Sequence, residues 1–477
     1  MREDLKSETD KDSWKKIRST RSVCPTCLKN IPAVLVENIN TGEIIMDRRC
    51  EWHGRFRVPV WRGRIDFDKW TYSAEKIGKD KGIRCPAGCG LCEEHRRDTC
   101  CVLLEVTERC NLHCRFCFAD AGKELEDPYT EKVKGWIRDL SVKCRGPLLQ
   151  FSGGEPTLRD DLPALASYAK EAGCEYVQIN TNGIRLAEDE AYVKALAESG
   201  VDFVFLQFDG TEDSIYRQLR GKDLFDIKQR AIENCGKCGL GVTLVPTIVR
   251  GVNEKNIGDM IRFAVSCSPV VRGVHFQPVS WMGRIPRKPE NIDHFTLDEL
   301  LKEVCQQTGI PEDSFIPSRC DHPLCGFHGS FLFKEEGSLL PLAPFQDNKN
   351  GWTNAVQNRR YVGGHWKASG EKGGRDGGEL DFSAKPDMQE EERVPGKKGK
   401  KKYVPLKIEH RMDEMDFGTF LKRMKEDSFT LTSMVFQDAS NLNVERLMRC
   451  SLHVYDNETG KIIPFCAKYL TTESLGE

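Results

Sequence analysis

Apolar runs and amphipathic stretches alternate through the central half of the chain. Six short apolar runs are typical of buried strands, at 102–106, 147–151, 176–180, 202–208, 241–249 and 272–279. Helical spacing of apolar residues lies between them, for example at 160–172, 187–199, 225–238 and 256–267, and again at 296–308. Alternating strands and helices predict βα units around a parallel sheet. Six units are too few for an eight-fold barrel, so we expect an α/β fold with a partial (β/α)6 barrel and chemistry at the carboxyl ends of its strands.

The segments that flank the barrel differ from it in composition and in the pattern of their apolar residues. Residues 1–21 are polar and charged, which predicts a frayed leader. Strand-like runs separated by turn residues predict a small β-rich module at 22–81, followed by a cysteine-rich stretch at 82–101 and the barrel at 102–310. Glycine and charge dominate 346–410, which predicts a largely disordered insert dividing a C-terminal region at 311–345 and 411–470. The basic run at 397–402 is typical of a solvated linker or of a contact with anionic lipid headgroups.

Composition narrows the function. Lys and Arg total 71 against 73 Asp and Glu, so the formal charge of −2 gives no global field for nucleic acid, and no such partner is expected. No stretch reaches the roughly 18 apolar residues of a membrane helix, and the polar N-terminus does not fit a secretory signal. We therefore expect a cytoplasmic chain in which the 21 cysteines hold metal or carry out redox chemistry.

Three cysteines follow the first barrel strand with the spacing C-x3-C-x2-C, and they are Cys110, Cys114 and Cys117. Three thiolates on one short loop suit three irons of a cubane cluster, because cysteine thiolates hold iron–sulfur clusters. The missing fourth cysteine leaves one iron open for a small molecule, as in an open catalytic metal site. The alternative is a zinc knuckle followed by a chance Gly-Gly turn, but the glycines lie one βα unit downstream at a strand end.

This loop resembles that of the radical SAM superfamily, in which S-adenosylmethionine binds the open iron of a [4Fe–4S] cluster. The second strand ends in Phe151-Ser152-Gly153-Gly154-Glu155-Pro156, which matches the superfamily's GGEP motif. The third and fourth strands end in Thr181-Asn182-Gly183 and Gln207-Phe208-Asp209-Gly210, and polar ends of this kind face the cofactor. The resemblance implies catalytic roles for the three cysteines and cofactor contacts from Phe118, Ser152, Gly153, Gly154, Glu155, Asn182, Gln207 and Asp209. Glycine lets the backbone approach the ligand, and Glu155 is expected to offer its carboxylate to the methionine ammonium group.

Two more cysteine groups precede the barrel. Cys24, Cys27 and Cys50 form C-x2-C…C, and with His53 they predict a tetrahedral rubredoxin-like or zinc-ribbon site for one iron or zinc ion. A later cysteine is the alternative to His53 as fourth ligand. Cys85, Cys89 and Cys92 repeat the C-x3-C-x2-C spacing and predict an auxiliary [4Fe–4S] cluster. Its fourth ligand is expected from Cys100 or Cys101, with His95 less favoured.

The C-terminal region holds four further candidate ligands. Two lie before the insert and two after it, and they are Cys320, Cys325, Cys450 and Cys466. Two pairs across an insert predict one more cluster that clasps the C-terminal region onto the barrel. The alternative is four unrelated buried thiols, since cysteine is often buried. The remaining thiols are interpreted as structural, namely Cys144, Cys174, Cys235, Cys238, Cys267 and Cys305.

The order of the motifs is more specific than the superfamily. It runs from CPTCL and CPAGCGLCEEH through TERCNLHCRFCFA and FSGGEPTLRDDLP to VERLMRCSLH and IIPFC. This order resembles the archaeal tetraether lipid synthase family, some relatives of which are labelled dihydropterin radical methyltransferases. The resemblance implies a transferase of lipid biosynthesis that joins the terminal carbons of two saturated isoprenoid tails by means of 5′-deoxyadenosyl radicals. It also implies three [4Fe–4S] clusters and one mononuclear iron.

Partners and mechanism follow from that resemblance as hypotheses. The lipid would be drawn from the membrane by an enzyme peripheral to its inner face, and ferredoxin or flavodoxin would supply electrons. Two sp3 carbons need two hydrogen abstractions, so the C-terminal centre is a candidate trap for the first alkyl radical. Apolar candidates for a lipid tunnel are Phe276, Trp281, Met282, Phe331 and Phe333, although ordinary core packing is favoured for each.

Two alternatives stay open beside lipid coupling. The first is a radical SAM methyltransferase or maturase that acts on a small heterocycle such as a pterin, because the barrel motifs are compatible with either substrate. The second is a non-catalytic iron–sulfur electron-transfer or zinc-ribbon protein, and the GGEP segment argues against it.

Overall fold

A computed structural model of the chain describes residues 13–71, 82–123, 125–334, 337–342, 353–368, 406–409 and 416–471. Its N-terminal part is an antiparallel sheet whose strands follow sequence order, β1 (Trp14–Val23), β2 (Asn30–Asn38), β3 (Ile44–Cys50) and β4 (Gly54–Trp61). Leu35, Met46 and Val58 pair across β2, β3 and β4 and are buried, as the two-residue period of a strand requires. The short helix α1 (Phe67–Thr71) follows this sheet.

The leader predicted at 1–21 is wrong for residues 14–21, because they belong to β1. β1 pairs antiparallel with β2 along its length, and a distant segment adds side-chain contacts. The Ser22 hydroxyl donates to the Leu442 carbonyl at 2.6 Å, and the Thr20 hydroxyl donates to the Asn443 side chain at 3.2 Å. Tertiary contacts therefore hold as a strand a sequence that appears frayed when it is considered alone. Residues 1–12 lie outside the described residues.

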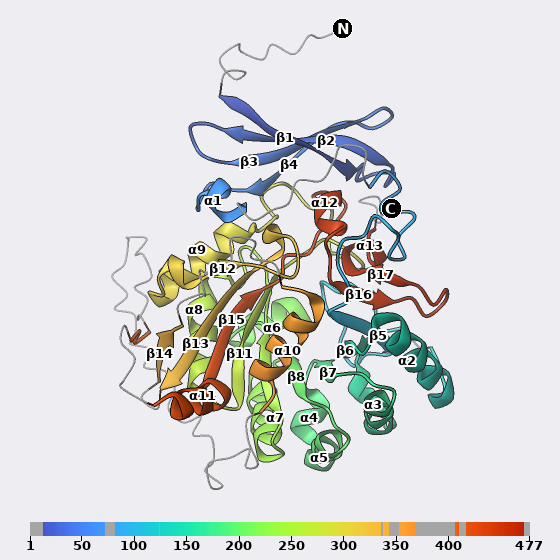
Figure 1. Cartoon of the computed structure of the whole chain (residues 1–477), viewed down its shortest axis with the longest axis vertical. Helices are drawn as coiled ribbons and strands as arrows, with labels where there is room; N and C mark the ends of the chain where they lie inside the picture. Colours follow the sequence, from blue (N-terminus) through green and yellow to red (C-terminus); the bar gives the residue numbers. More distant parts are fainter. Residues whose placement is uncertain are drawn as a thin grey trace.

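The centre of the molecule is a parallel sheet built from the six predicted strands, as Figure 1 shows. Neighbours follow sequence order through β5 (Cys101–Thr107), β6 (Leu148–Gly153), β7 (Tyr176–Thr181), β8 (Phe203–Gln207), β9 (Gly241–Val245) and β11 (Val271–Pro278). The connecting helices are α2 (Thr130–Cys144), α3 (Leu162–Glu171), α4 (Ile184–Glu188), α5 (Glu190–Glu198), α6 (Asp213–Arg220), α7 (Phe225–Lys237) and α8 (Ile257–Ser266). The predicted α/β fold with a parallel sheet core is confirmed.

Segments from later in the chain extend both edges of this sheet. On one side β15 (Ser428–Ser433) lies parallel to β11, and β13 (Phe327–Lys334) and β12 (Ile316–Pro317) continue the sheet. On the other side β16 (Leu452–Tyr455) lies parallel to β5 and pairs with β17 (Ile462–Pro464). Residues 434–451, which include α12 (Val444–Leu447), therefore run from one edge of the parallel sheet to the other. Shorter elements are β10 (Thr247–Ile248), β14 (Ser338–Pro341), α9 (Leu297–Thr308), α11 (Phe417–Glu426) and α13 (Phe465–Lys468).

The disordered insert predicted at 346–410 contains an ordered helix, α10 (Ala355–Trp366), so that prediction is wrong for this part. The Trp366 indole donates to the Thr430 hydroxyl at 2.9 Å and its ring packs against Phe205. The buried Arg359 donates to the Thr99 carbonyl at 3.0 Å. Contacts with Thr99 and Thr430 therefore hold this polar segment against the rest of the fold. The basic run at 397–402 lies outside the described residues.

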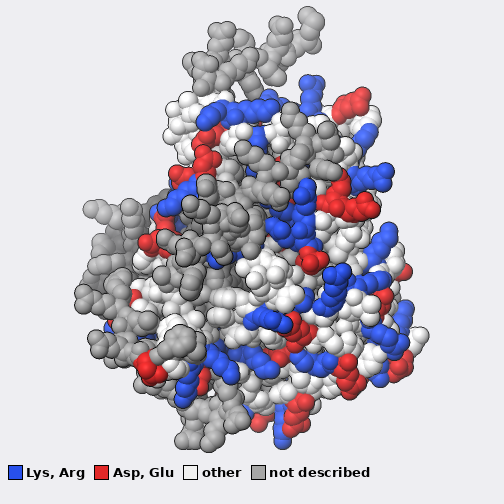
Figure 2. All heavy atoms as spheres, viewed as in Figure 1, with Lys and Arg blue, Asp and Glu red and all other residues white. Residues whose placement is uncertain are grey.

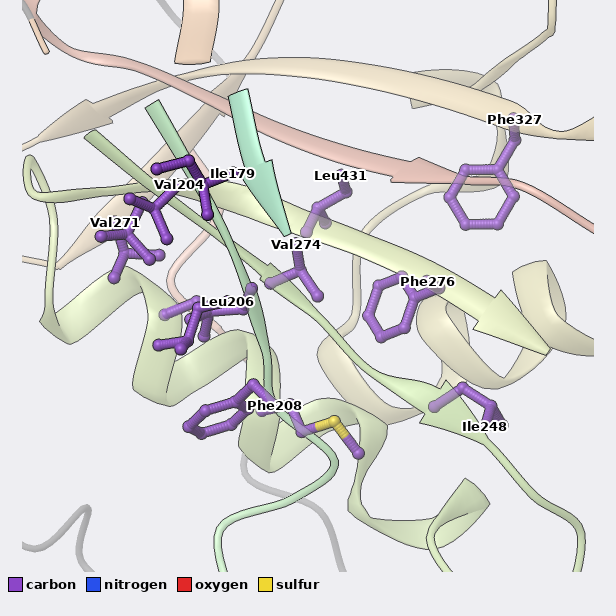
Figure 3. Packing of buried hydrophobic residues seen from close by; sticks show 14 of the residues in the cluster. Ile179, Val204, Leu206, Phe208, Ile248, Val271, Val274, Phe276, Phe327 and Leu431 are labelled. Carbon is purple, nitrogen blue, oxygen red and sulfur yellow. The ribbon is translucent and has the colours of Figure 1, made fainter. Parts of the chain in front are cut away.

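The main core lies between the parallel sheet and its helices. Figure 3 shows Val204 and Leu206 of β8 together with Val274 and Phe276 of β11 in this core. Full burial of such a side chain stabilises the fold by about 1.5–3 kcal/mol. Among the described residues, no helix is both long and apolar enough to cross a membrane.

Candidate functional site

The three cysteines of the C-x3-C-x2-C motif lie on the loop that follows β5, and all are partly exposed. The segment after β11 fixes this loop. Cys117 and Arg284 exchange two backbone hydrogen bonds of 3.1 and 2.9 Å, and Arg284 Nε donates to the Cys114 carbonyl at 3.0 Å. Arg284 belongs to the segment that follows β11. Its bonds to Cys114 and Cys117 therefore hold the loop at the carboxyl ends of the parallel strands.

The two glycines at the end of β6 pack directly on this loop. The Gly154 amide donates to the Thr107 carbonyl at 2.8 Å, and the Glu155 amide donates to the Arg109 carbonyl at 2.8 Å. A Cβ atom at Gly154 would lie 2.0 Å from the Arg109 oxygen, and Gly153 has φ +119°. Only glycine fits both positions, so the motif brings its backbone within reach of any ligand on the loop.

Glu155 lies buried where β6 and β7 end. Its carboxylate is buried and accepts hydrogen bonds from the Thr181 hydroxyl at 2.7 Å and from the Asn182 amide at 2.7 Å. Thr157 donates to it from both its hydroxyl, at 2.6 Å, and its amide, at 3.1 Å. Burial raises the pKa of Glu155, and these donors oppose that rise. The carboxylate ties the ends of β6 and β7 together, and the expected contact with a methionine ammonium group stays a prediction.

Polar ends of β7 and β8 continue the site. Asn182 Nδ2 donates to Asn111 Oδ1 on the cysteine loop at 2.7 Å. Gln207 donates to Asp209, whose buried carboxylate also accepts two bonds from Arg220, at 2.6 and 2.9 Å. Asn182, Gln207 and Asp209 therefore lie at the predicted edge, where they form part of one hydrogen-bonded network.

Two buried cations of this network were missed by the sequence reasoning. Arg220, at the end of α6, contacts the thiol of Cys114 as well as Asp209. Lys228 of α7 donates to Gln207 Oε1 at 3.0 Å and to the Asn182 carbonyl, and burial lowers its pKa to about 7. The sequence did contain a signal for Lys228, because it lies on the same helix face as Ala231 and Ile232. A lysine on a buried face predicts a polar partner nearby, since burying an unpaired lysine costs free energy.

The last two predicted cofactor contacts lie elsewhere around the site. Phe118 is partly buried and packs against Phe465 and Tyr469, with ring centroids 5.2 and 4.8 Å apart, so it joins the loop to α13. Ser152 is buried within β6. This site fits a [4Fe–4S] cluster with S-adenosylmethionine at its open iron. It offers three thiols on one loop, the backbone of Gly153 and Gly154, and a network of polar and cationic side chains.

The N-terminal sheet brings four candidate metal ligands together. One ligand atom from each of Cys24, Cys27, Cys50 and His53 lies within 4.8 Å of the others. His53 Nδ1 is 3.5 Å from both Cys24 Sγ and Cys50 Sγ. Burial of Cys50 opposes ionisation, yet the Trp52 amide and His53 lower the pKa of Cys50 to about 6. Three soft ligands and an imidazole in this arrangement fit a tetrahedral zinc or iron ion.

The Cys85, Cys89 and Cys92 segment lies beside the C-terminal region. Cys85 contacts Cys89, and a hydrogen bond between the two thiols is the main cause of a raised pKa at Cys89, with Cys92 and Cys450 adding to it. Cys450 lies near this group and Cys466 packs in the same apolar cluster, whereas Cys100 contacts Cys320. The Cys101 thiol donates to Gln150 at 3.3 Å, and His95 contacts the Cys450 carbonyl at 2.8 Å.

The predicted C-terminal group of four is only partly assembled. Cys325, Cys450 and Cys466 line one cavity, whereas Cys320 lies against Cys100 and Ala355. Asn358 of α10 donates to the Cys100 thiol at 3.2 Å, which helps to hold this pair apart from the cavity. The grouping of Cys320 with the other three, and of Cys100 with Cys85–Cys92, is therefore corrected. Arg446 lines the same cavity and contacts Cys325, and its buried Nε has no partner among the described residues.

The six thiols that were interpreted as structural lie apart from these groups. Cys144, Cys174, Cys235 and Cys267 are buried, while Cys238 and Cys305 are partly buried. Burial raises the pKa of each of them.

Comparison with known sequences defines the class of protein. The profile of the Radical SAM superfamily matches residues 104–264, and that of the HMPTM N-terminal zinc ribbon domain matches residues 16–62. The chain is thus a radical SAM enzyme with an N-terminal zinc-ribbon module. Among solved structures, the SAM-bound form of Streptococcus suis SuiB is similar with a TM-score of 0.36 and 19% identity, over 43% of this chain and 46% of that chain.

Similarity to curated relatives is more specific. The chain is 35% identical over 481 residues to a 7,8-dihydro-6-hydroxymethylpterin dimethyltransferase from Methanocaldococcus jannaschii, covering 94% of this chain and 92% of that protein. The chain belongs to the same family as this relative. An Fe-coproporphyrin III synthase from Methanosarcina barkeri is 39% identical over 162 residues, covering 33% of this chain and 38% of that protein.

Proposed function

We propose that this chain is a radical SAM methyltransferase that acts on a pterin-like heterocycle. The observation that supports the proposal is the 35% identity, over 94% of the chain, to a relative whose name states methyl transfer to a dihydropterin. The matching zinc-ribbon module at residues 16–62 extends the likeness beyond the barrel. The pterin alternative of the sequence analysis is thereby favoured over lipid coupling.

The residues of the chain would hold and orient the cofactors. When bound, a reduced cluster with S-adenosylmethionine supplies a 5′-deoxyadenosyl radical that takes hydrogen from an unactivated C–H bond. Cys110, Cys114 and Cys117 would bind the cluster, and Gly153 and Gly154 let the end of β6 pack against the backbone of their loop. Arg220, paired with Asp209, and Lys228, which donates to Gln207 and Asn182, would fix the polar side chains beside the loop.

The two remaining thiol groups are proposed as auxiliary cluster sites. Cys85, Cys89 and Cys92 would bind one cluster, and Cys325, Cys450 and Cys466 would bind another in the cavity beside it. The buried, unpaired Nε of Arg446 supports the second site, because a sulfide or thiolate would satisfy it.

Lipid coupling is kept as a second candidate because of the lining of that cavity. Beside its thiols it is lined largely by apolar side chains, namely Met434, Val435, Phe436, Leu447, Leu452 and Phe465. The cavity is small, with a volume of about 20 Å³, so a saturated chain could reach Cys450 only if these side chains moved. The tunnel candidates do not add to this, since Phe276, Trp281, Met282 and Phe331 are buried in cores and Phe333 packs on one. This candidate would place the enzyme at the inner membrane face.

One experiment separates the two substrates. Protein reconstituted anaerobically with iron and sulfide is incubated with S-adenosylmethionine, dithionite and either 7,8-dihydro-6-hydroxymethylpterin or an archaeol phospholipid. Mass spectrometry should find a pterin product heavier by one or two CH2 units. A lipid product lighter by two hydrogens per coupled pair, with the pterin unchanged, would overturn the proposal in favour of the second candidate. A Cys114→Ala variant is the control for background chemistry.

A further inference from the structure

The two faces of the parallel sheet are covered by different elements, because successive side chains of a strand point to opposite sides. Val204 and Leu206 of β8 belong to the main core, which lies between the sheet and the helices that connect its strands. Phe203 and Phe205 belong instead to a separate apolar cluster with Trp366 of α10. The helix α10 therefore packs on the face that lies opposite the connecting helices, and we call this face the inner face.

The position of α10 on the inner face is fixed at the amino ends of two strands. Arg360 pairs with Glu175 at 3.1 Å, just before β7 begins, and Lys367 pairs with Asp202 at 2.8 Å, just before β8 begins. Figure 1 shows α10 in front of the sheet, and Figure 2 shows blue Lys and Arg side chains among white atoms at the centre of the same view. The helix thus covers the part of the inner face that lies farthest from the catalytic loop.

Amide side chains continue the inner face on β6 and β7. Asn180 is the cross-strand partner of Phe205, and Gln178 lies two residues before Asn180, so both amides lie on this face. Gln150 is in turn the cross-strand partner of Gln178. Gln178 Nε2 donates to Asn180 Oδ1 at 2.7 Å, and Gln150 Oε1 accepts from the Cys101 thiol at 3.3 Å. Three amide side chains are therefore neighbours on the inner face.

A fourth amide lies on β11. The ring of His275 packs against those of Phe205 and Trp366, with centroids 5.5 and 5.9 Å apart, so His275 lies on the inner face, and so does Gln277 two residues later. Gln277 and Asn180 are partly exposed, although β11 and β7 each have a neighbouring strand on both sides. Among the described residues, the Gln277 side chain and Asn180 Nδ2 make no hydrogen bond. Polar groups in such a position are satisfied by water or by a ligand.

These amides lie next to the catalytic loop. Asn180 comes two residues before Asn182, whose side chain donates to Asn111 on that loop at 2.7 Å. Two residues of a strand correspond to about 7 Å. A molecule bound to Asn180 would therefore lie close to the place where S-adenosylmethionine is expected.

We infer that Gln150, Asn180 and Gln277 bind the substrate and select a heterocycle whose edge carries both hydrogen-bond donors and acceptors. The inference rests on the proposed function and names residues that would recognise its substrate. An amide side chain offers an acceptor oxygen and two donor hydrogens, which suits ring N–H and C=O groups such as those of a pterin. A saturated hydrocarbon would leave these amides unpaired, and that costs free energy.

Trp366 and Phe205 set the size of that substrate. Their ring centroids are 4.8 Å apart, and the Trp366 indole is held by its hydrogen bond to the Thr430 hydroxyl. From Phe205 to Gln207, where β8 ends, the inner face extends by only two residues, or about 7 Å. This depth suits a compact ring system, whereas a long isoprenoid chain would meet the two aromatic rings.

The experiment removes single amides from the inner face. The variants are Gln150→Met and Gln277→Met, since methionine keeps the length of the side chain and removes its hydrogen bonds. They lie on different strands, so each tests the inference independently. The control is Gln306→Met, which changes an exposed glutamine of α9. Binding of 7,8-dihydro-6-hydroxymethylpterin to each reconstituted protein with S-adenosylmethionine is measured anaerobically by isothermal titration calorimetry, and circular dichroism checks that each variant is folded.

Each inner-face variant should bind the pterin about tenfold more weakly than the wild type, because one hydrogen bond to the ligand is lost. Gln306→Met should bind it as the wild type does. Equal affinities in all four proteins, an equal loss in the control, or no binding to the wild type would overturn the inference. Methylation of the pterin by a wild type whose affinity the two variants share would leave the proposed function intact. Weaker binding in the two variants, with no methylated product from the wild type, would instead support the inference and contradict the proposed function.

Discussion

The catalytic loop at Cys110–Cys117 and the cavity at Cys325, Cys450 and Cys466 gather the same kind of side chain by different means. On the loop, three thiols lie on one short segment that is fixed by β5, by the glycines after β6 and by Arg284. In the cavity, each thiol comes from a different segment, and residues 434–451 must cross from one sheet edge to the other to bring Cys450 there. A loop motif therefore carries its geometry in its spacing, whereas the cavity depends on the whole fold.

Two single substitutions test this comparison most strongly. They remove one thiol from the pair that precedes the insert, Cys320 and Cys325, and one from the pair that follows it, Cys450 and Cys466. Cys450→Ala should lose the iron and sulfide of one cluster, because Cys450 lines the thiol cavity. It should still form 5′-deoxyadenosine, since the catalytic loop is intact. Cys320→Ala should keep the full iron content, because Cys320 contacts Cys100 outside the cavity. Iron and sulfide counting after reconstitution measures both, and an equal loss in the two variants would contradict the regrouping.

The buried ion pair beside the catalytic loop offers a second comparison, between interior and surface charge. Arg220→Met should lower the free energy of unfolding by about 3–5 kcal/mol, because it leaves the buried Asp209 carboxylate without its partner. Arg217→Met, three residues earlier on α6, breaks an exposed pair with Asp223 and should cost less than about 1 kcal/mol. Urea unfolding of the metal-free proteins measures both. Similar costs would show that the Asp209–Arg220 pair does not hold the site together.

Two glycine substitutions should change the free energy of unfolding least. They compare a glycine that is required because a Cβ would clash with one whose only effect is its conformational freedom. Gly154→Ala should destabilise the protein by about 1–3 kcal/mol and weaken binding of S-adenosylmethionine, because its Cβ would meet the Arg109 carbonyl. Gly135→Ala lies in an exposed part of α2 with nothing within 4 Å of the new Cβ, and it should stabilise by about 0.5–1 kcal/mol. Thermal unfolding of both variants tests this, and a tolerated Gly154→Ala would remove the steric argument.

Much of the barrel could be predicted because its signals are local. The six apolar runs became β5–β9 and β11, with β10 splitting off the fifth run, and the helix expected at 296–308 is α9. The loop at 110–117 and the glycines after β6 followed from spacing within a few residues. His53 was also within reach, since it lies three residues after Cys50.

The failures share a physical cause, which is dependence on distant contacts. β1 pairs with β2 and contacts Leu442 and Asn443, and α10 contacts Thr99 and Thr430, so neither could be inferred from its own composition. Cys320 was grouped with Cys325 because the two are near in sequence, yet the fold turns one toward Cys100 and the other into the cavity.

The most direct test of the central claim is reductive cleavage of S-adenosylmethionine by the reconstituted protein with dithionite. The account predicts that 5′-deoxyadenosine and methionine form in equal amounts with the wild type and with Cys238→Ser, whose thiol lies at the end of α7. It predicts that neither product forms with Cys114→Ala, which removes one of the three thiols of the catalytic loop. Cleavage that persists in Cys114→Ala, or its absence in the wild type with a full complement of iron, would contradict the account.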